Sequence, residues 1–325
     1  MNAQKIIGLV AWIACFFATS VAAAEDPAPQ ETMAQKALAR DKVCTVCHNE
    51  SWRVPVLSLY QTRHGNRADP RAPNCQSCHG PSDSHQKDPG GAHPDVVFAT
   101  NSKNVSSAEE RSGACLSCHD SKVLPRAHWA GSEHQSRDIA CSNCHTTHTP
   151  RDPVLTKVTQ SDVCFACHQT QRAQIHRIST HPILAGKVAC SDCHNPHGST
   201  GPKLLVKNSV NETCYTCHAE KRGPFLWEHS PVVDDCTNCH TPHGSTNTPL
   251  LKARVPWLCQ ECHTGDHGAQ INSGANLPNG DATTVGGRLP LANQSPRAQT
   301  NARACLNCHV LVHGSNHPAG AKYQR

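Results

Sequence analysis

Two stretches, CSDCHNPHGST at residues 190–200 and CTNCHTPHGST at residues 236–246, determine how the whole chain is organised. Each places one histidine directly after its second cysteine and another three residues later. The shorter pattern inside them, C-x-x-C-H, occurs ten times and uses 20 of the 21 cysteines. The cysteine pairs are Cys44 and Cys47, Cys75 and Cys78, Cys115 and Cys118, Cys141 and Cys144, Cys164 and Cys167, Cys190 and Cys193, Cys214 and Cys217, Cys236 and Cys239, Cys259 and Cys262, and Cys305 and Cys308.

The C-x-x-C-H pattern is typical of the covalent attachment of c-type haem. Cysteines three positions apart share one face of a helical turn, so both sulfurs can reach the vinyl groups of one porphyrin. The histidine that follows projects under the same ring as the proximal iron ligand. We therefore expect ten covalently bound haem c groups, with proximal ligands His48, His79, His119, His145, His168, His194, His218, His240, His263 and His309.

Two other interpretations of paired cysteines explain less. Zinc knuckles use C-x-x-C pairs, but a zinc site has no reason to place a histidine after every pair. Disulfides would suit an exported chain, and they too leave the ten histidines unexplained.

Histidines also supply candidates for the second axial ligand of each iron. The ten proximal residues leave 14 of the 24 histidines, and Met33 is the one methionine after Met1. Bis-histidine, six-coordinate iron is therefore expected. His197 and His243 lie too close to their own proximal histidines to reach the opposite face of the same haem, so each should bind a neighbouring haem.

An internal repeat selects the distal ligands. The chain reads as five two-haem units, residues 43–85, 115–148, 164–197, 214–243 and 259–317. Each contains a first motif, a linker histidine, a second motif and a trailing histidine. The expected distal ligands are His64, His85, His134, His148, His181, His197, His229, His243, His267 and His313, which leaves His93, His128, His176 and His317 unassigned.

The remaining segments are a leader and connections. Residues 1–24 resemble a signal peptide, with Lys5 before an apolar stretch and cleavage expected after Ala24. A polar leader follows at 25–42, with a helix expected from Glu31 to Arg40, and 318–325 form a tail. The long gaps at 86–114 and 268–304 predict loops with little secondary structure.

Composition predicts a fold organised by porphyrin. Hydrophobic residues make up 37% of the chain and aromatic residues 4%, which is little for a packed core. We expect a multihaem cytochrome c fold, mostly irregular with short helices around ten attachment sites, elongated, with few or no strands. The formal net charge of +5 becomes +4 without Lys5. Ten ferric haems with ionised propionates add about −10, which argues against a nucleic-acid partner.

Ten closely spaced irons with both axial positions filled favour electron transfer over catalysis, because a haem enzyme needs an open iron position. The alternatives are a multihaem nitrite, hydroxylamine or sulfur-oxyanion reductase, and a soluble periplasmic electron shuttle. The length and the number of haems favour a wire over a shuttle.

The stretches CSDCHNPHGS, NETCYTCHAEKRGPFLWEHSPV, CLNCHVLVHGSNHPAG and CHGPSDSH are more specific than the shared motif. In them the chain resembles the MtrA/DmsE family of periplasmic decahaem cytochromes, in particular its MtoA branch from iron oxidisers. The resemblance implies bis-histidine ligation and a periplasmic location at the outer membrane. It implies an outer-membrane β-barrel partner of the MtrB type, periplasmic and inner-membrane cytochromes as further partners, and in some systems an outer-surface cytochrome. The resemblance favours inward electron flow from Fe(II), with outward flow to Fe(III) or dimethyl sulfoxide as the alternative.

Overall fold

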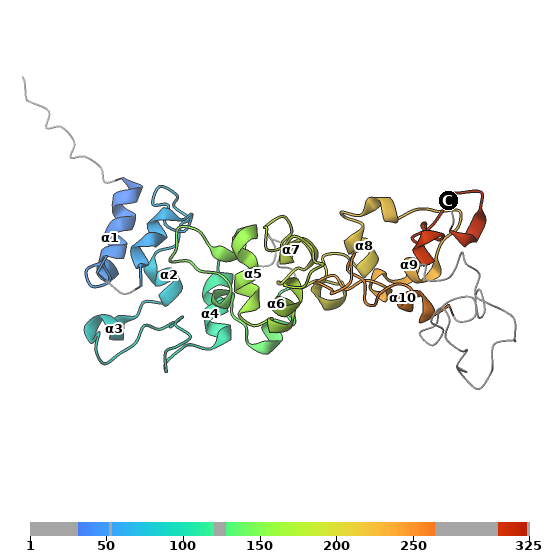
Figure 1. Ribbon diagram of the computed structural model, residues 1–325. Helices are drawn as coiled ribbons and strands as arrows, with labels where there is room; N and C mark the ends of the chain where they lie inside the picture. Colours follow the sequence, from blue (N-terminus) through green and yellow to red (C-terminus); the bar gives the residue numbers. More distant parts are fainter. Residues whose placement is uncertain (1–31, 52–53, 120–127, 264–304, 324–325) are drawn as a thin grey trace, which may run out of the picture.

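The computed structural model describes residues 32–51, 54–119, 128–263 and 305–323. These residues form short helices and irregular connections along an elongated body, with helix α1 at one end and the C-terminal residues at the other (Figure 1). In these ranges β-structure is limited to isolated bridges, so the expected irregular, short-helix fold is confirmed. The expected signal peptide at 1–24, the leader before Thr32 and the loop at 268–304 lie outside the described residues.

The α-helices are short, and α1 is the longest of those described. They are α1 (Met33–Thr45), α2 (Cys75–His79), α3 (Asp83–Lys87), α4 (Ala108–Leu116), α5 (Lys157–Phe165), α6 (Gln169–Ile175), α7 (Cys190–Cys193), α8 (Val210–Cys214), α9 (Ser230–Asp234) and α10 (Trp257–Gln260). The 3-10 turns are η1 (Val56–Gln61), η2 (Gln135–Arg137), η3 (Cys141–Asn143), η4 (Pro153–Leu155), η5 (Pro202–Leu204), η6 (Ala219–Lys221), η7 (Cys236–Asn238), η9 (Cys305–Asn307) and η10 (Gly320–Lys322).

The attachment motifs alternate between two local structures. The first motif of each expected unit begins in the last residues of an α-helix, namely α1, α4, α5, α8 or α10. The second motif begins a separate helical turn with its first cysteine, in α2, η3, α7, η7 or η9. In both cases the histidine N–H bonds the carbonyl of the first cysteine, as at His194 (2.9 Å) and His263 (2.9 Å). This turn places the two cysteines and the histidine on one side.

Two helices differ from the sequence prediction. Helix α1 begins two residues later than expected, after a capping box between Thr32 and Gln35, and continues past Arg40 to include Cys44. Helix α4 begins at Ala108, inside the 86–114 segment, so the prediction of a loop was wrong for residues 108–114. Its start is fixed by a second capping box, in which Ser107 and Glu110 bond each other's backbone N–H groups.

Apolar packing in the described part of the chain is sparse. The hydrophobic cluster there joins Phe165 of α5, Ile175 of α6 and Ile183, with Val188 packed against it. So little buried apolar surface cannot offset the conformational entropy of an ordered chain of this length. This agrees with porphyrin supplying much of the core.

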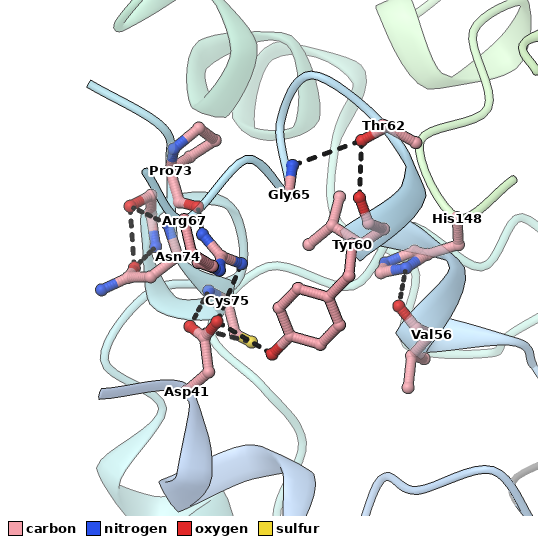
Figure 2. Close-up of polar contacts among 12 residues, drawn as sticks. Asp41, Val56, Tyr60, Thr62, Gly65, Arg67, Pro73, Asn74, Cys75 and His148 are labelled. Atoms are coloured by element: carbon pink, nitrogen blue, oxygen red, sulfur yellow. Dashed lines mark hydrogen bonds and ion pairs between the residues drawn. The ribbon is translucent and has the colours of Figure 1, made fainter. Parts of the chain in front are cut away.

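A buried ion pair fastens α1 to the following segment (Figure 2). The guanidinium of Arg67 lies 2.8 Å from the Asp41 carboxylate, and the two side chains are 7% and 1% exposed. The Tyr60 hydroxyl donates to the same carboxylate (2.9 Å), and Arg67 also donates to the Pro73 carbonyl (2.6 Å). The backbone N–H of Cys75 donates to Asp41 at 3.4 Å. Asp41 thereby connects the helix that carries the first motif to the turn that begins the second.

None of the helices in the described ranges combines the length and the apolar character that a bilayer crossing requires.

We predict that Asp41→Ala loosens the N-terminal unit, because it leaves the Arg67 charge buried without its partner. The expected loss is about 3 kcal/mol, or roughly 100-fold faster amide hydrogen exchange in α1 and around Cys75. The matched control is Asp69→Ala, since Asp69 pairs with Arg71, whose side chain is 88% exposed. Hydrogen exchange measured by mass spectrometry should be unchanged in the control, and equal effects in the two variants would contradict the assignment.

Candidate haem sites

Nine histidine pairs lie ring to ring in the described residues, and each joins one expected proximal ligand to one expected distal ligand. Centroid separations run from 5.8 Å for His64 with His119 to 6.4 Å for His79 with His148. The other pairs are His48 with His85, His134 with His168, His145 with His197, His181 with His218, His194 with His243, His229 with His263 and His240 with His313.

These separations fit two imidazoles on opposite sides of one metal ion. A metal–nitrogen bond of about 2 Å and a nitrogen roughly 1.2 Å from its ring centre put the two centroids about 6.4 Å apart. The ring planes make angles from 11° to 86°. Such variation is compatible with ligation, because each ring can rotate about its metal–nitrogen bond. The residues present therefore fit haem iron.

Hydrogen bonds leave the ligating nitrogen available. Nδ1 of His181 lies 2.8 Å from the Pro242 carbonyl oxygen, which can only accept, so Nδ1 carries the proton and Nε2 keeps its lone pair. The same arrangement occurs at His79 (with Val96), His85 (Ala92), His134 (Pro196), His148 (Val56), His194 (Lys203), His229 (Val312), His240 (Pro249) and His309 (Lys322).

Burial also favours the neutral imidazole that binds metals. Loss of hydration disfavours the charged ring and lowers its pKa below the usual value. This is the main cause of the lowered pKa of His48, His79, His229, His240, His243 and His313.

The pairing follows a rule that spacing alone did not reveal. A linker histidine faces the first proximal histidine of the next unit, in the pairs 64 with 119, 134 with 168, 181 with 218 and 229 with 263. A trailing histidine faces the second proximal histidine of the preceding unit, in the pairs 148 with 79, 197 with 145, 243 with 194 and 313 with 240. Consecutive units are thus joined twice, once in each direction.

Contacts between the two crossing segments hold them together. The Nδ1 bonds of His134, His181 and His229 go to the carbonyls just before His197, His243 and His313 respectively. Ser179 and Ser245 exchange two backbone hydrogen bonds beside one such crossing (3.0 and 2.8 Å), and Trp227 and Ser315 do so beside another (both 2.9 Å).

Glycine allows the segment after a trailing histidine to pass close to the backbone of the preceding segment. Gly244 directly follows His243 and has a φ of +152°, and a Cβ there would collide with the Gln174 carbonyl oxygen. Gly198, after His197, has a φ of +108°, and a Cβ would collide with the His128 carbonyl oxygen. Both positions also favour glycine because their φ is positive. This explains the H-G pair in the two stretches quoted at the outset.

The two ends of the chain depart from the rule. His85 trails the unit at 43–85, and it faces His48 of the same unit. His267 lies outside the described residues, so its expected role as a distal ligand stays a prediction. Of the four unassigned histidines, His93 contacts Asn104 (2.6 Å), His317 accepts from the Ala319 N–H (3.1 Å), and His128 and His176 are exposed.

The cysteines place the motifs in sequential order. The first cysteines of the two motifs in a unit lie close enough for one thiol to contribute to the pKa shift of the other, in the pairs 44 with 75, 115 with 141, 164 with 190, 214 with 236 and 259 with 305. The second cysteines of consecutive units also lie near each other. The pKa of Cys78 is raised first by burial and then by Cys118 of the next unit, and the pKa of Cys144 is raised first by burial and then by Cys167. Cys217 and Cys262 act in the same way on Cys193 and Cys239, after larger contributions from other causes.

Sequence reasoning missed several side chains that contact the expected ligands. Trp129 is 8% exposed and packs edge-on against His197, with 6.3 Å between centroids. Its buried Nε1 has no hydrogen-bond partner among the described atoms, and a haem propionate is the kind of acceptor that would fit. Asp152 contacts Nδ1 of His145 at 2.6 Å. For Trp129, the one indication in the sequence was that a tryptophan stands in a linker of a chain with few aromatic residues.

The described residues contain no cluster of three or more histidine, cysteine or acidic side chains that could hold a bare metal ion. A structural zinc site needs four such ligands. In this part of the chain the donors are arranged as imidazole pairs beside cysteine pairs, which is the arrangement that haem c uses.

Comparisons with known proteins agree with this arrangement. The family described as "Doubled CXXCH motif" matches residues 181–223 and 229–268, and "Cytochrome c-type protein NrfB-like" matches residues 75–158. Multiheme cytochrome MtrA of Shewanella baltica is 46% identical over 286 residues, 87% of this chain and 80% of that protein. Cytochrome c-type protein NrfB of Escherichia coli O6:H1 is 29% identical over 123 residues, 36% of this chain and 57% of that protein.

The similarity to MtrA covers most of both chains, and it coincides with the repeated attachment motif and the short-helix fold. The chain belongs to the MtrA family of multihaem c-type cytochromes, which are electron-transfer proteins with several covalently bound haems.

Proposed function

We propose that the chain carries ten haem c groups in single file and conducts electrons along them. The observation that supports this most directly is the set of nine imidazole pairs, each beside a different attachment motif. The haems supply reversible one-electron exchange between ferric and ferrous iron. The cysteines hold each porphyrin, and the paired histidines keep each iron low-spin in both states.

The order of the cysteines supports sequential transfer through five two-haem units, 43–85, 115–148, 164–197, 214–243 and 259–317. Each motif has its neighbours in sequence as its neighbours in space. Electrons would therefore pass the motifs in their order along the chain. Two imidazoles on each iron leave no position for substrate, which disfavours a reductase.

The partner we propose is an outer-membrane β-barrel of the MtrB type that encloses this wire. Membership of the MtrA family and the elongated body (Figure 1) support a barrel as the enclosing structure. The chain would be exported by its signal peptide at 1–24 and lie in the periplasm at the outer membrane. Periplasmic and inner-membrane cytochromes would exchange electrons at one end, and extracellular iron or an outer-surface cytochrome at the other.

For direction we propose inward flow from extracellular Fe(II), on the resemblance to the MtoA branch. A haem chain conducts both ways, so its partners' potentials set the direction. Outward flow to Fe(III) or dimethyl sulfoxide uses the same wire with different partners.

We predict that His243→Ala opens the iron of the 190–194 motif, because it removes the ring that faces His194 at 6.0 Å. The ferrous variant should bind about one carbon monoxide per ten haems, and the ferric variant should show a high-spin signal. Wild type should bind almost none.

The control is His176→Ala, since His176 is exposed and is not among the paired rings. It should keep the low-spin spectrum of the wild type. Equal carbon monoxide binding by wild type and His243→Ala would show that His243 is not a ligand.

We also predict that the protein transfers electrons across a bilayer only together with its barrel. Liposomes that enclose a reducible dye would receive an external reductant too large to pass the barrel. The cytochrome alone and the barrel alone should each match empty liposomes, and the pair should reduce the dye quickly. Dye reduction by the cytochrome alone would contradict the enclosed wire, and a stable but inactive pair would favour a soluble shuttle.

A further inference from the structure

The loop after a second motif normally supplies a backbone carbonyl to the proximal histidine. Nδ1 of His194 bonds the carbonyl of Lys203 at 2.9 Å, and Nδ1 of His240 bonds that of Pro249 at 3.0 Å. In both cases the partner lies nine residues after the histidine. These equivalent sites show what the repeat provides by default, namely a neutral acceptor.

The second unit replaces that carbonyl with a carboxylate. Nδ1 of His145 lies 2.6 Å from Oδ2 of Asp152, which follows it by seven residues, so the loop is two residues shorter. The other carboxylate oxygen accepts the backbone N–H groups of Thr146 and Val154, both at 3.3 Å. The Asp152 side chain is 13% exposed and caps η4. Its position is therefore fixed at both oxygens.

A carboxylate acts on a ligating imidazole differently from a carbonyl. It draws the Nδ1 proton more strongly, so the ring gains imidazolate character and donates more electron density to the metal. A more basic ligand stabilises ferric iron relative to ferrous iron, as does a fixed negative charge nearby. Both effects act in the same direction.

A second proximal histidine, His218, also has a carboxylate near its Nδ1, but the two groups do not form a hydrogen bond. Nδ1 of His218 lies 3.9 Å from Glu220, beyond hydrogen-bond distance, and both side chains are more than half exposed. On the far side of the His145 pair, buried Trp129 packs on His197. Exclusion of water there strengthens the electrostatic effect of a fixed charge.

We propose that Asp152 is a positioning residue that lowers the reduction potential of the haem held by Cys141 and Cys144. That potential would lie below those of the haems at the equivalent motifs 190–194 and 236–240. The inference rests on the proposed ten-haem, bis-histidine assignment. An electron on the fourth haem in the file would then be less stable than one on the haems at those two motifs. Its reduction takes one electron and no proton.

The test compares wild type with Asp152→Asn, which keeps an oxygen acceptor of the same size without the charge. Intact protein is first checked by mass spectrometry for ten haems and by its optical spectrum for low-spin iron, and a failure in wild type would count against the proposed function itself. In an anaerobic potentiometric titration, about one-tenth of the α-band amplitude of Asp152→Asn should then appear at a higher potential than in wild type. One low-spin component of the ferric electron paramagnetic resonance spectrum should change as well.

Two further variants make the result specific. Asp152→Glu keeps the charge and should retain the wild-type resonance component more closely than Asp152→Asn. Asp192→Asn removes the same charge inside the 190–194 motif, where the carboxylate is bonded to Lys157 and the Ala189 N–H rather than to an imidazole. It should leave the resonance spectrum unchanged. An assembled Asp152→Asn protein that titrates like wild type would overturn the proposal, as would loss of the haem from this variant.

Discussion

The pairing of imidazole rings between units, which we propose gives each haem iron its second axial ligand, is the interaction on which the rest of this structure depends. In most of the described chain a ring faces one from an adjacent unit, as in the pairs His64 with His119 and His79 with His148. Two such pairs in opposite directions join consecutive units. The described residues bury few apolar side chains, so these pairs of rings are the main contacts that hold one unit against the next. Folding and haem attachment should therefore be coupled.

The crossings also account for features that look like local detail. Gly244 has no side chain because the ligand segment passes against the backbone of the preceding unit. The five helices that carry a first motif, α1, α4, α5, α8 and α10, end at its first cysteine or one residue later. In the unit at 43–85, His85 faces His48 of the same unit, and the buried pair of Asp41 and Arg67 fastens helix α1 to the segment that follows it.

The attachment motifs predicted the proximal ligands, because covalent haem chemistry fixes residue types at fixed spacing. The internal repeat added the candidate distal ligands, and the polar composition added the fold class. The partner of each ring was not predictable, since it depends on how one unit lies against the next. Helix α4 differs from the loop that a long gap between motifs predicts, although its Ser107 and Glu110 capping box is visible in the sequence. Asp152 was missed because its role appears only when its loop is compared with those at His194 and His240.

The measurement that tests the central claim most directly is a structure of the haem-loaded protein, phased on the anomalous signal of iron. The account predicts ten irons in single file, ordered as the motifs are in sequence, with the iron of the 190–194 motif bound by His194 and by His243 of the following unit. An iron at that motif bound instead by His197 of its own unit, or irons grouped in separate clusters, would contradict it.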